Sequence, residues 1–259
     1  MRVRYVVTGA STGMGARFVS EVRREGVEVI ALDVADPTVA VDDFIRVDLA
    51  DPLAISDAAD AIASLDALVN CAGVAAGGSA PDETVFAVNY LGLRALTDAL
   101  VSKIRDGGAV LSIGSMAGHR WRDRSDAYRR LLAAGSFEAG LEWLRTAAEV
   151  RERPVYGVSK EAVWAYTSVL ATTLFTRGIR VNSVGPGLVD TRLRAAFEGA
   201  MSDATRDRMN EIVGAPIAPA EITAVMRFVL SDAASRINAQ NIVVDGGYLA
   251  GAEFAQWTL

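Results

Sequence analysis

Short apolar runs alternate with longer helical patterns along the chain, and this alternation constrains the fold more than any other feature. The runs are apolar on both faces, which is typical of strands in a parallel sheet that helices cover on both sides. We expect strands at residues 3–7, 27–32, 44–47, 67–70, 109–113, 180–184 and 241–244. We expect helices near residues 14–25, 52–63, 83–104, 155–177 and 219–231. This pattern predicts an α/β fold with one doubly wound, seven-stranded parallel sheet and right-handed crossovers.

A length of 259 residues suits one large α/β domain, which we expect to span residues 1–259. Only ten residues separate Asp33 from Phe44, so the helix of that crossover is short or missing. Residues 119–153, in contrast, form a long interval before the next expected helix. Helical spacing there predicts one or two extra helices, with Ser136 as a possible cap; the spaced residues are Phe137, Leu141, Leu144 and Ala148.

Composition excludes several classes of protein. The net charge of −6 argues against nucleic acid as the main partner. The single cysteine, Cys71, excludes an intramolecular disulfide and is typical of a reducing compartment. Neither a signal peptide nor an apolar run of about 18 residues is present, so we expect a cytoplasmic protein without a membrane partner.

A glycine-rich turn at residues 8–15 directly follows the first expected strand and opens a helix. Gly9, Gly13 and Gly15 would let the backbone approach a pyrophosphate, which the helix N-terminus attracts. This placement indicates a dinucleotide-binding Rossmann fold, although glycine turns also occur for packing alone.

Asp33 ends the second expected strand, about 20 residues after the glycine turn. A carboxylate there can accept hydrogen bonds from an adenosine ribose and would repel a 2′-phosphate. No lysine or arginine lies in the turn or just after Asp33. The sequence therefore favours NAD over NADP, with an ordinary strand-end aspartate as the alternative.

Tyr156 and Lys160 are four residues apart on an expected helix, so both side chains project from one face. An ammonium beside a phenol favours the phenolate and lowers the pKa of the tyrosine. By itself such a pair is most often a solvated helix face. The glycine turn upstream favours the interpretation as a catalytic pair.

With these motifs in order, the chain resembles the short-chain dehydrogenase/reductase family over nearly its whole length. Residues 8–15 are similar to the family's TGxxxGxG turn, 70–73 to its NNAG motif with Cys71 replacing the second asparagine, and 186–191 to its PGxxxT segment. The resemblance implies that the cofactor is NAD and that these motifs bind it. The implied cofactor-binding residues are Gly9, Ser11, Thr12, Gly13, Met14, Gly15, Asp33, Asp48, Leu49, Asn70, Ala72, Gly73, Tyr156, Lys160, Pro186, Gly187, Val189 and Thr191.

The resemblance also implies a catalytic tetrad of Asn89, Ser115, Tyr156 and Lys160. Tyr156 would exchange a proton with the substrate, Lys160 would lower the pKa of Tyr156, and Ser115 would hydrogen-bond the substrate oxygen. Asn89 would hold a water through its backbone carbonyl. Taken singly, Asn89 could instead bond within its helix, and Ser115 could be a cap.

The long interval between Ser115 and Tyr156 makes the chain similar to one subgroup, the bacterial 3α-hydroxysteroid dehydrogenase/carbonyl reductases and the coniferyl-alcohol dehydrogenases. In the former, the insertion obstructs a helix–helix interface, so the resemblance implies a homodimer, with a homotetramer as the alternative. The arginine-rich start of the insertion is either a subsite for an anionic group or, more commonly, a solvated face. Its arginines are Arg120, Arg122, Arg124, Arg129 and Arg130.

Residues 188–215 correspond to the substrate lid of the family. Apolar side chains there are either core contacts or walls of a hydrophobic slot, which Trp121 and Trp257 could extend. The lid side chains are Leu193, Phe197, Met201, Met209, Ile212 and Val213. We therefore expect a bulky, mostly apolar alcohol or ketone as substrate: a steroid, or equally an aryl or terpenoid alcohol.

Two other functions are compatible with the same scaffold. Halohydrin dehalogenases keep the serine and tyrosine but replace the lysine and lose the glycine turn, whereas Lys160 and the three glycines are intact here. An NAD-sensing protein without catalysis has no need of the complete tetrad. An oxidoreductase that transfers hydride between NAD and an alcohol or carbonyl compound is thus the favoured interpretation.

Overall fold

Seven parallel strands form one sheet in the computed structural model, which describes residues 2–75 and 80–254. Their order is β3-β2-β1-β4-β5-β6-β7, so the predicted doubly wound sheet is confirmed. The strands are β1 Arg4–Thr8, β2 Glu28–Asp33, β3 Asp43–Arg46, β4 Leu65–Asn70, β5 Ile104–Ile113, β6 Arg180–Pro186 and β7 Asn241–Val244. The order reverses between β1 and β4, and the carboxyl ends of strands at such a switch point form a ligand crevice.

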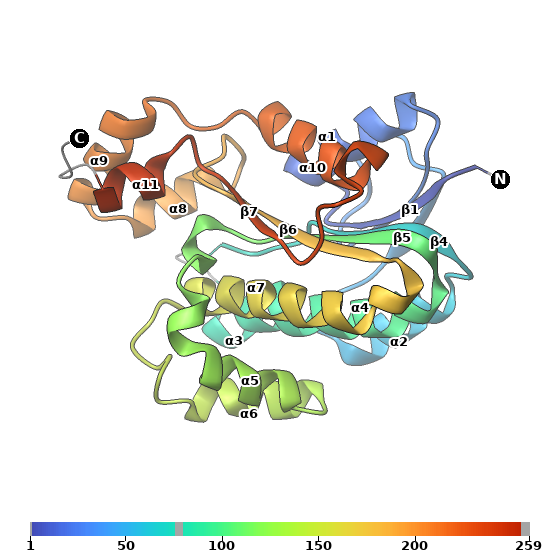
Figure 1. Cartoon of the computed structure of the whole chain (residues 1–259), viewed down its shortest axis with the longest axis horizontal. Helices are drawn as coiled ribbons and strands as arrows, with labels where there is room; N and C mark the ends of the chain where they lie inside the picture. Colours follow the sequence, from blue (N-terminus) through green and yellow to red (C-terminus); the bar gives the residue numbers. More distant parts are fainter. Residues whose placement is uncertain (1, 76–79, 255–259) are drawn as a thin grey trace.

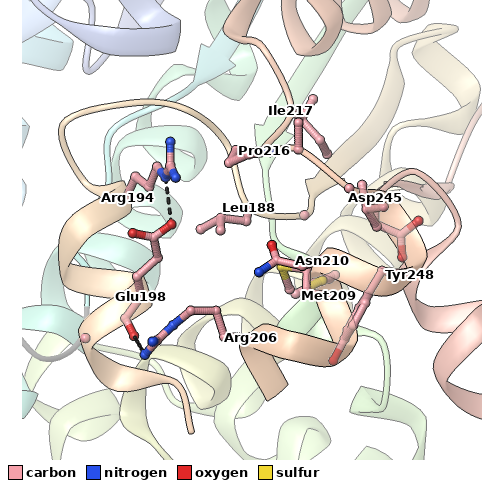
Figure 2. Close-up of a pocket in the computed structure, with 16 residues that line it drawn as sticks. Leu188, Arg194, Glu198, Arg206, Met209, Asn210, Pro216, Ile217, Asp245 and Tyr248 are labelled. Carbon is pink, nitrogen blue, oxygen red and sulfur yellow. Dashed lines mark hydrogen bonds and ion pairs between the residues drawn. The ribbon is translucent and has the colours of Figure 1, made fainter. Parts of the chain in front are cut away.

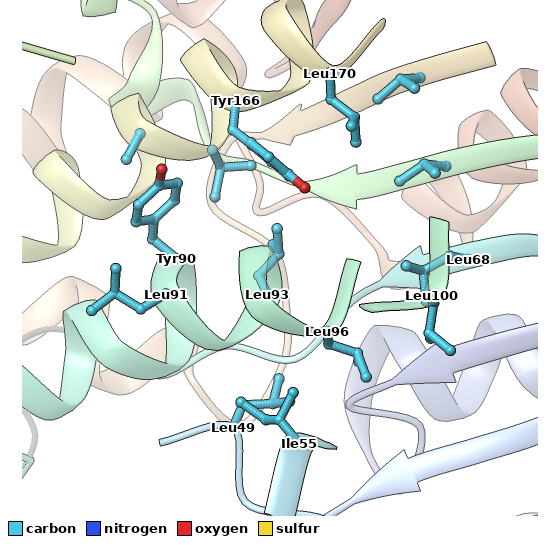
Figure 3. Packing of buried hydrophobic residues seen from close by; sticks show 14 of the residues in the cluster. Leu49, Ile55, Leu68, Tyr90, Leu91, Leu93, Leu96, Leu100, Tyr166 and Leu170 are labelled. Carbon is cyan, nitrogen blue, oxygen red and sulfur yellow. The ribbon is translucent and has the colours of Figure 1, made fainter. Parts of the chain in front are cut away.

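Helices cover both faces of the sheet (Figure 1). On one face lie α1 (Gly13–Arg24) and α10 (Pro219–Leu230), which pack on each other. On the other lie α2 (Pro52–Asp60), α4 (Leu93–Leu100) and α7 (Val155–Thr173). Each face has its own apolar cluster, because the strands present buried side chains on both sides. Figure 3 shows part of the larger cluster, where Leu100 of α4 lies beside Leu68 of β4.

The helix predicted near 83–104 consists of several pieces. It comprises α3 (Asp82–Phe86), a π-helical turn η1 (Ala87–Gly92), α4 and a short 3₁₀ turn η2 (Val101–Lys103). The helical segment therefore gives way at Ile104 to β5, which begins five residues earlier than predicted because Ile104 pairs with Leu65. π-helical turns inside helices are frequent at functional sites, and this one contains Asn89.

No helix occurs between β2 and β3, as the short interval predicted. Hydrogen bonds fix this connection to the glycine turn instead. The Thr38 hydroxyl donates to the Ser11 carbonyl over 2.6 Å, and the Ser11 hydroxyl donates to the Ala35 carbonyl over 2.6 Å.

The long interval before α7 contains the predicted extra helices. They are η3 (Met116–Gly118), η4 (Trp121–Arg124), α5 (Ser125–Ala133) and α6 (Phe137–Thr146). Ser136 caps α6, since its hydroxyl accepts from the Ala139 amide over 3.1 Å. Helices α5 and α6 pack on the outer side of α7 and α3 (Figure 1).

The C-terminal part supplies a helical layer beyond β6. It contains α8 (Arg194–Ala200) and α9 (Asp203–Val213), and α11 (Tyr248–Phe254), which follows β7, packs on α9. The remaining short turns are η5 (Phe175–Arg177) and η6 (Asp232–Ala234). Among the described residues, no helix is both long and apolar enough to cross a membrane.

Candidate active site

The glycine turn after β1 has a backbone that other residues could not adopt. Gly9 and Gly13 have φ values of +63° and +57°, in the left-handed region that favours glycine. A Cβ at Gly9 would lie 2.6 Å from the Ala72 Cα, and one at Gly15 would lie 2.0 Å from the Gly9 carbonyl. The lack of a side chain at Gly9 and Gly15 therefore lets the turn pack closely against Ala72, just after β4, and against the start of α1.

The N-terminus of α1 is free to bind an anion. Its cap residue, Thr12, makes no side-chain capping bond, and the first turn contains no acidic residue. A Cβ at Gly13 would meet only the Thr191 methyl, at 4.0 Å, so the backbone there faces open space. The unpaired N–H groups of a helix start attract phosphate, and the turn therefore fits a pyrophosphate.

A groove of about 590 Å³ extends from this turn across the carboxyl ends of β1, β2 and β4. It brings together most of the predicted cofactor residues. Those that line it are Gly9, Thr12, Gly13, Met14, Gly15, Asp33, Asp48, Leu49, Ala72, Gly73 and Thr191. The groove also includes Val34, Thr84 and Val88, which were not predicted because apolar and hydroxyl side chains after a strand or on a helix have no distinctive motif.

Asp33 is held at the edge of this groove. Its two carboxylate oxygens accept from the backbone amides of Ser11, over 2.9 Å, and Ala35, over 3.1 Å. Each oxygen retains a further lone pair for a ribose hydroxyl. Arg46 of β3 pairs with Asp33 in the strand register, a proximity that their separation in the sequence does not reveal. The Arg46 guanidinium, however, bonds to the Val34 carbonyl and to Asp36.

Two predicted cofactor residues have side chains that do not line the described cavities. Ser11 is fully buried and donates to Ala35, so it positions Asp33 from behind. Asn70 is buried in the core, where its amide donates to the hydroxyls of Thr97, over 3.0 Å, and Ser112. Both side chains point into the sheet and its loops, so Ser11 and Asn70 support the residues that line the groove and do not line it themselves.

Ser115, Tyr156 and Lys160 meet at the far end of the groove. They line a cavity of about 80 Å³ together with Pro186, Gly187, Val189 and Thr191. Ser115 follows β5, and its hydroxyl accepts from the Ala117 amide over 3.2 Å. Tyr156 and Lys160 belong to the first turns of α7 and lie on one face, as their spacing predicted. Met14, Ala72 and Gly73 line both cavities, so the two form one continuous path.

Asn89 lies behind this cavity and does not line it. Its side-chain oxygen accepts from the Val74 amide over 2.7 Å, while its nitrogen donates to the Val74 carbonyl and the Ser159 hydroxyl. The alternative that Asn89 bonds within its own helix is therefore wrong for the side chain. These bonds connect the π-helical turn to the loop after β4 and to α7.

Burial has the largest effect on the pKa values of both Tyr156 and Lys160. Burial raises the pKa of Tyr156 to about 12, and the neighbouring Ser115 hydroxyl opposes this increase. Burial also lowers the pKa of Lys160 to about 8. The Lys160 ammonium lies 5.7 Å from the Tyr156 ring centroid and donates to the Ile113 carbonyl over 2.9 Å, so a lowering of the Tyr156 pKa by Lys160 stays a prediction.

Glu161, the residue after Lys160, is a fully buried carboxylate that sequence reasoning missed. It accepts from Arg124 Nε over 2.9 Å, from Arg153 Nη2 over 2.8 Å and from the Tyr128 hydroxyl. Arg124 and Arg153 stand near the two ends of the insertion. The insertion is thus fixed to the catalytic helix beside Lys160, and an acidic residue on a helix gives no sign of such burial in the sequence.

The arginine-rich start of the insertion does not line any of the described cavities. Arg120 and Arg129 pair with Asp123 and Asp126 on the surface, which agrees with a solvated face. Arg124 is the exception, because it is turned inward to Glu161. For Arg120 and Arg129 the structure therefore favours the solvated face over a subsite for an anionic group.

Among the lid residues, Leu193 and Phe197 line the catalytic cavity. The Phe197 ring packs edge-on against Tyr156, with the ring centroids 5.0 Å apart. Trp121 packs on the core and lines none of the described cavities, so its place in a hydrophobic slot stays a prediction. Trp257 lies outside the described residues.

Trp164 is a further residue that the sequence did not reveal. It is 3% exposed, and its indole lies under the carboxyl ends of β5 and β6. A Cβ at Gly114 would lie 2.1 Å from its Nε1, and one at Gly185 would lie 2.5 Å from its Cζ2. The two glycines make room for the indole next to Ser115. The sequence did not reveal this role, because an apolar residue at helical spacing is typical of any core.

Comparison with known proteins agrees with this arrangement. Residues 4–129 match the family model described as short chain dehydrogenase, and residues 140–249 match the model described as Enoyl-(Acyl carrier protein) reductase. The chain is 33% identical over 246 residues to the coniferyl-alcohol dehydrogenase of Pseudomonas sp. (strain HR199 / DSM 7063), covering 94% of this chain and 95% of that protein. The chain therefore belongs to the short-chain dehydrogenase/reductase family, and it is an oxidoreductase that acts on the CH–OH group of alcohols.

Solved structures are similar over the same length. The 3-alpha-hydroxysteroid dehydrogenase from Pseudomonas sp. B-0831, complexed with NADH, is 28% identical with a TM-score of 0.78, covering 98% of this chain and 100% of that one. A short chain dehydrogenase from Burkholderia cenocepacia J2315, in complex with NADP, is 27% identical with a TM-score of 0.73, covering 95% and 98%. Relatives thus bind either NAD(H) or NADP, and both members of the predicted subgroup are represented among the similar proteins.

Proposed function

We propose that this protein is an NAD-dependent dehydrogenase/reductase that interconverts a secondary or bulky, mostly apolar alcohol and its carbonyl compound by hydride transfer. The observation that carries the proposal is the convergence of Ser115, Tyr156 and Lys160 at one end of a groove that begins at a free helix N-terminus. A hydroxysteroid and an aryl or terpenoid alcohol are the candidate substrates. The names of the similar proteins, a coniferyl-alcohol dehydrogenase and a 3-alpha-hydroxysteroid dehydrogenase, support both classes.

The groove fits a dinucleotide in shape and in donor chemistry. The start of α1 would hold the pyrophosphate, and Asp33 would accept from the adenosine ribose. Asp48 and Leu49 would contact the adenine, while Val189 and Thr191 would hold the nicotinamide amide. We assign NAD as the cofactor because the Asp33 carboxylate would repel a 2′-phosphate, and because its neighbour Arg46 is already bonded to Val34 and Asp36.

The bound nicotinamide would accept or supply the hydride. Tyr156 would take the alcohol proton during oxidation and return a proton during reduction. Ser115 would hydrogen-bond the substrate oxygen as negative charge develops on it. Lys160 would bond the nicotinamide ribose and assist ionisation of Tyr156, and Asn89 would hold this arrangement through the π-helical turn. The Tyr156 phenolate needs such assistance, since burial raises the pKa of Tyr156 to about 12.

We also propose that residues 188–215 form a lid over this site and that the protein is a homodimer. Phe197 packs on Tyr156 from α8, which supports a lid that excludes water from the proton exchange. The insertion supports a dimer over a tetramer, because α5 and α6 already cover the outer side of α7.

Titration of wild-type protein and a Tyr156→Phe variant with NADH and NADPH, followed by assay of a broad alcohol panel, tests the proposal. We expect both proteins to bind NADH equally and more tightly than NADPH. The variant should lose at least a hundred-fold in turnover, because the proton-exchanging hydroxyl is gone while the groove is intact.

Each outcome addresses a separate part of the proposal. Full activity of the variant would remove Tyr156 from its assigned role, and tighter NADPH binding would contradict the role given to Asp33. Tight cofactor binding by the wild type, without turnover of any alcohol or ketone, would instead indicate an NAD-sensing protein.

A further inference from the structure

A second cavity, of about 390 Å³, adjoins the catalytic centre under the lid helices α8 and α9 (Figure 2). Gly187 lines both this cavity and the catalytic one, and Met116 in its wall follows Ser115 directly. The catalytic cavity is only about 80 Å³, so it accommodates the reacting carbon and its immediate neighbours. The rest of a larger substrate has the adjoining cavity open to it, and that volume is typical of small-molecule sites.

Apolar atoms form about half of the cavity wall. Met209 of α9 lies across the cavity from Pro216 and Ile217, with Leu188 between them (Figure 2). Val213 of α9 also lines the cavity. Apolar walls of this kind favour a hydrocarbon or aromatic body in the ligand.

Most of the charged groups in the wall are already paired. Arg194 of α8 bonds to Glu198 over 2.7 Å and to Asp190 over 3.2 Å. The two carboxylate oxygens of Asp245 accept from the amides of Gly247 and Leu249, each over 2.8 Å. Arg194 is thus occupied by carboxylates, whereas each Asp245 oxygen keeps one further lone pair.

Two neighbouring groups on α9 do have capacity left. Arg206 bonds through its terminal nitrogens to Asp203 and to the Glu198 carbonyl, but its Nε is buried without an acceptor among the described residues. Asn210, an exposed residue one helical turn further on, turns its amide toward the cavity and makes no side-chain hydrogen bond within the described part of the chain (Figure 2). A buried N–H without an acceptor is costly, so an oxygen acceptor supplied by a ligand would relieve it.

We propose that this cavity binds the distal end of the substrate, and that Arg206 and Asn210 recognise a neutral oxygen acceptor there, such as an aryl ether, a phenol or a carbonyl. A neutral group is favoured over a carboxylate, because Arg194 and Arg206 in the wall are balanced by Glu198 and Asp245. The inference rests on the proposed dehydrogenase function and deepens it. The substrate is then an apolar alcohol with one oxygen at its far end.

Cinnamyl alcohols with hydrogen, methoxy or carboxylate at the para position provide the test, since they differ only at the distal end. We expect wild-type kcat/KM for the methoxy compound to exceed that for the other two by about ten-fold, mainly through KM. In Asn210→Leu and Arg206→Met variants this preference should shrink to within two-fold. An Arg208→Met variant, on the same helix but outside the cavity wall, should retain it.

NADH titration and thermal unfolding of each variant check that the groove and the fold are intact. Turnover of all three compounds without preference, or loss of preference in Arg208→Met as well, would overturn the inference while leaving the dehydrogenase function in place. Preference for the carboxylate would overturn the neutral acceptor. Absence of turnover, here and across the broad alcohol panel, would overturn the proposed function and this inference with it.

Discussion

Lys160 is one of only two lysines in the chain, and its ammonium is buried next to Ile113. Burial lowers its pKa from 10.5 to about 8. Between these values the unfolded chain binds more protons than the folded one, so stability contributed at this position increases as pH rises. We expect the free energy of unfolding to gain about 1 kcal/mol from Lys160 between pH 7 and pH 9.

A Lys160→Met variant isolates this contribution. Denaturant unfolding of both proteins at pH 7 and pH 9 should give a smaller gain in the variant, because other groups titrate equally in each. Carbon-13 methylation of the lysines followed by NMR gives a second measurement, with Lys103 as an internal reference signal. A Lys160 signal that titrates near pH 10.5 would contradict the buried ammonium.

The chemistry-bearing residues were predictable individually, whereas their surroundings were not. Gly9, Gly13 and Gly15 have the spacing of a phosphate-binding turn directly after a first strand, and Tyr156 and Lys160 have helical spacing. In contrast, the pKa of Tyr156 depends on burial and on where the Lys160 ammonium points, and both are set by tertiary packing. Tertiary packing also determines that the Ser11 and Asn70 side chains point into the protein and not into the groove.

At the level of elements, the insertion is fixed to α7 by one carboxylate. Glu161 is fully buried and bonds to Arg124, Arg153 and Tyr128, all from the insertion or its C-terminal end. Removing one partner of a buried ion pair leaves the other charges uncompensated. A Glu161→Gln variant should therefore lose about 1–3 kcal/mol in free energy of unfolding and show faster hydrogen exchange in residues 119–153.

Glu149→Gln is the matched control, since Glu149 pairs with Arg130 on the surface of the same insertion. Surface ion pairs contribute little, so its unfolding and exchange should match those of the wild type. Equal effects in both variants would show that the buried cluster has no special role.

Some element boundaries were predictable from the sequence and others were not. The extra helices and the cap at Ser136 were predicted correctly, because helical spacing and capping are local properties. The π-helical turn at Asn89 and the early start of β5 were not predicted. Both depend on partners distant in the chain: Val74 and Ser159 for Asn89, and Leu65 for Ile104.

At the level of the whole molecule, the surface beside the insertion is covered by helices, whereas the surface at the β7 edge of the sheet is open. The insertion covers α7 on one side, while β7 forms an edge of the sheet beside α10. Val243 of β7 and Phe228 of α10 are 37% and 47% exposed there. An unpaired edge strand with exposed apolar side chains is a ready surface for a second copy. We expect light scattering to give twice the chain mass of 27.4 kDa.

A Phe228→Glu variant should shift this assembly toward the monomer, because a charge in the contact must be desolvated. Leu53→Glu, at an exposed position on α2, is the control and should remain dimeric. A mass of four chains, or a dimer unaffected by Phe228→Glu, would contradict this assignment of the surface.

The Trp164 indole has a further consequence, because it occupies the space between Gly114 and Gly185 next to Ser115. Tryptophan emission overlaps the absorption band of reduced nicotinamide, so excitation energy passes between them at short range. The protein therefore contains its own optical probe close to the reacting atoms. Quenching of this emission would follow each loading and release of reduced cofactor in real time, without any attached dye.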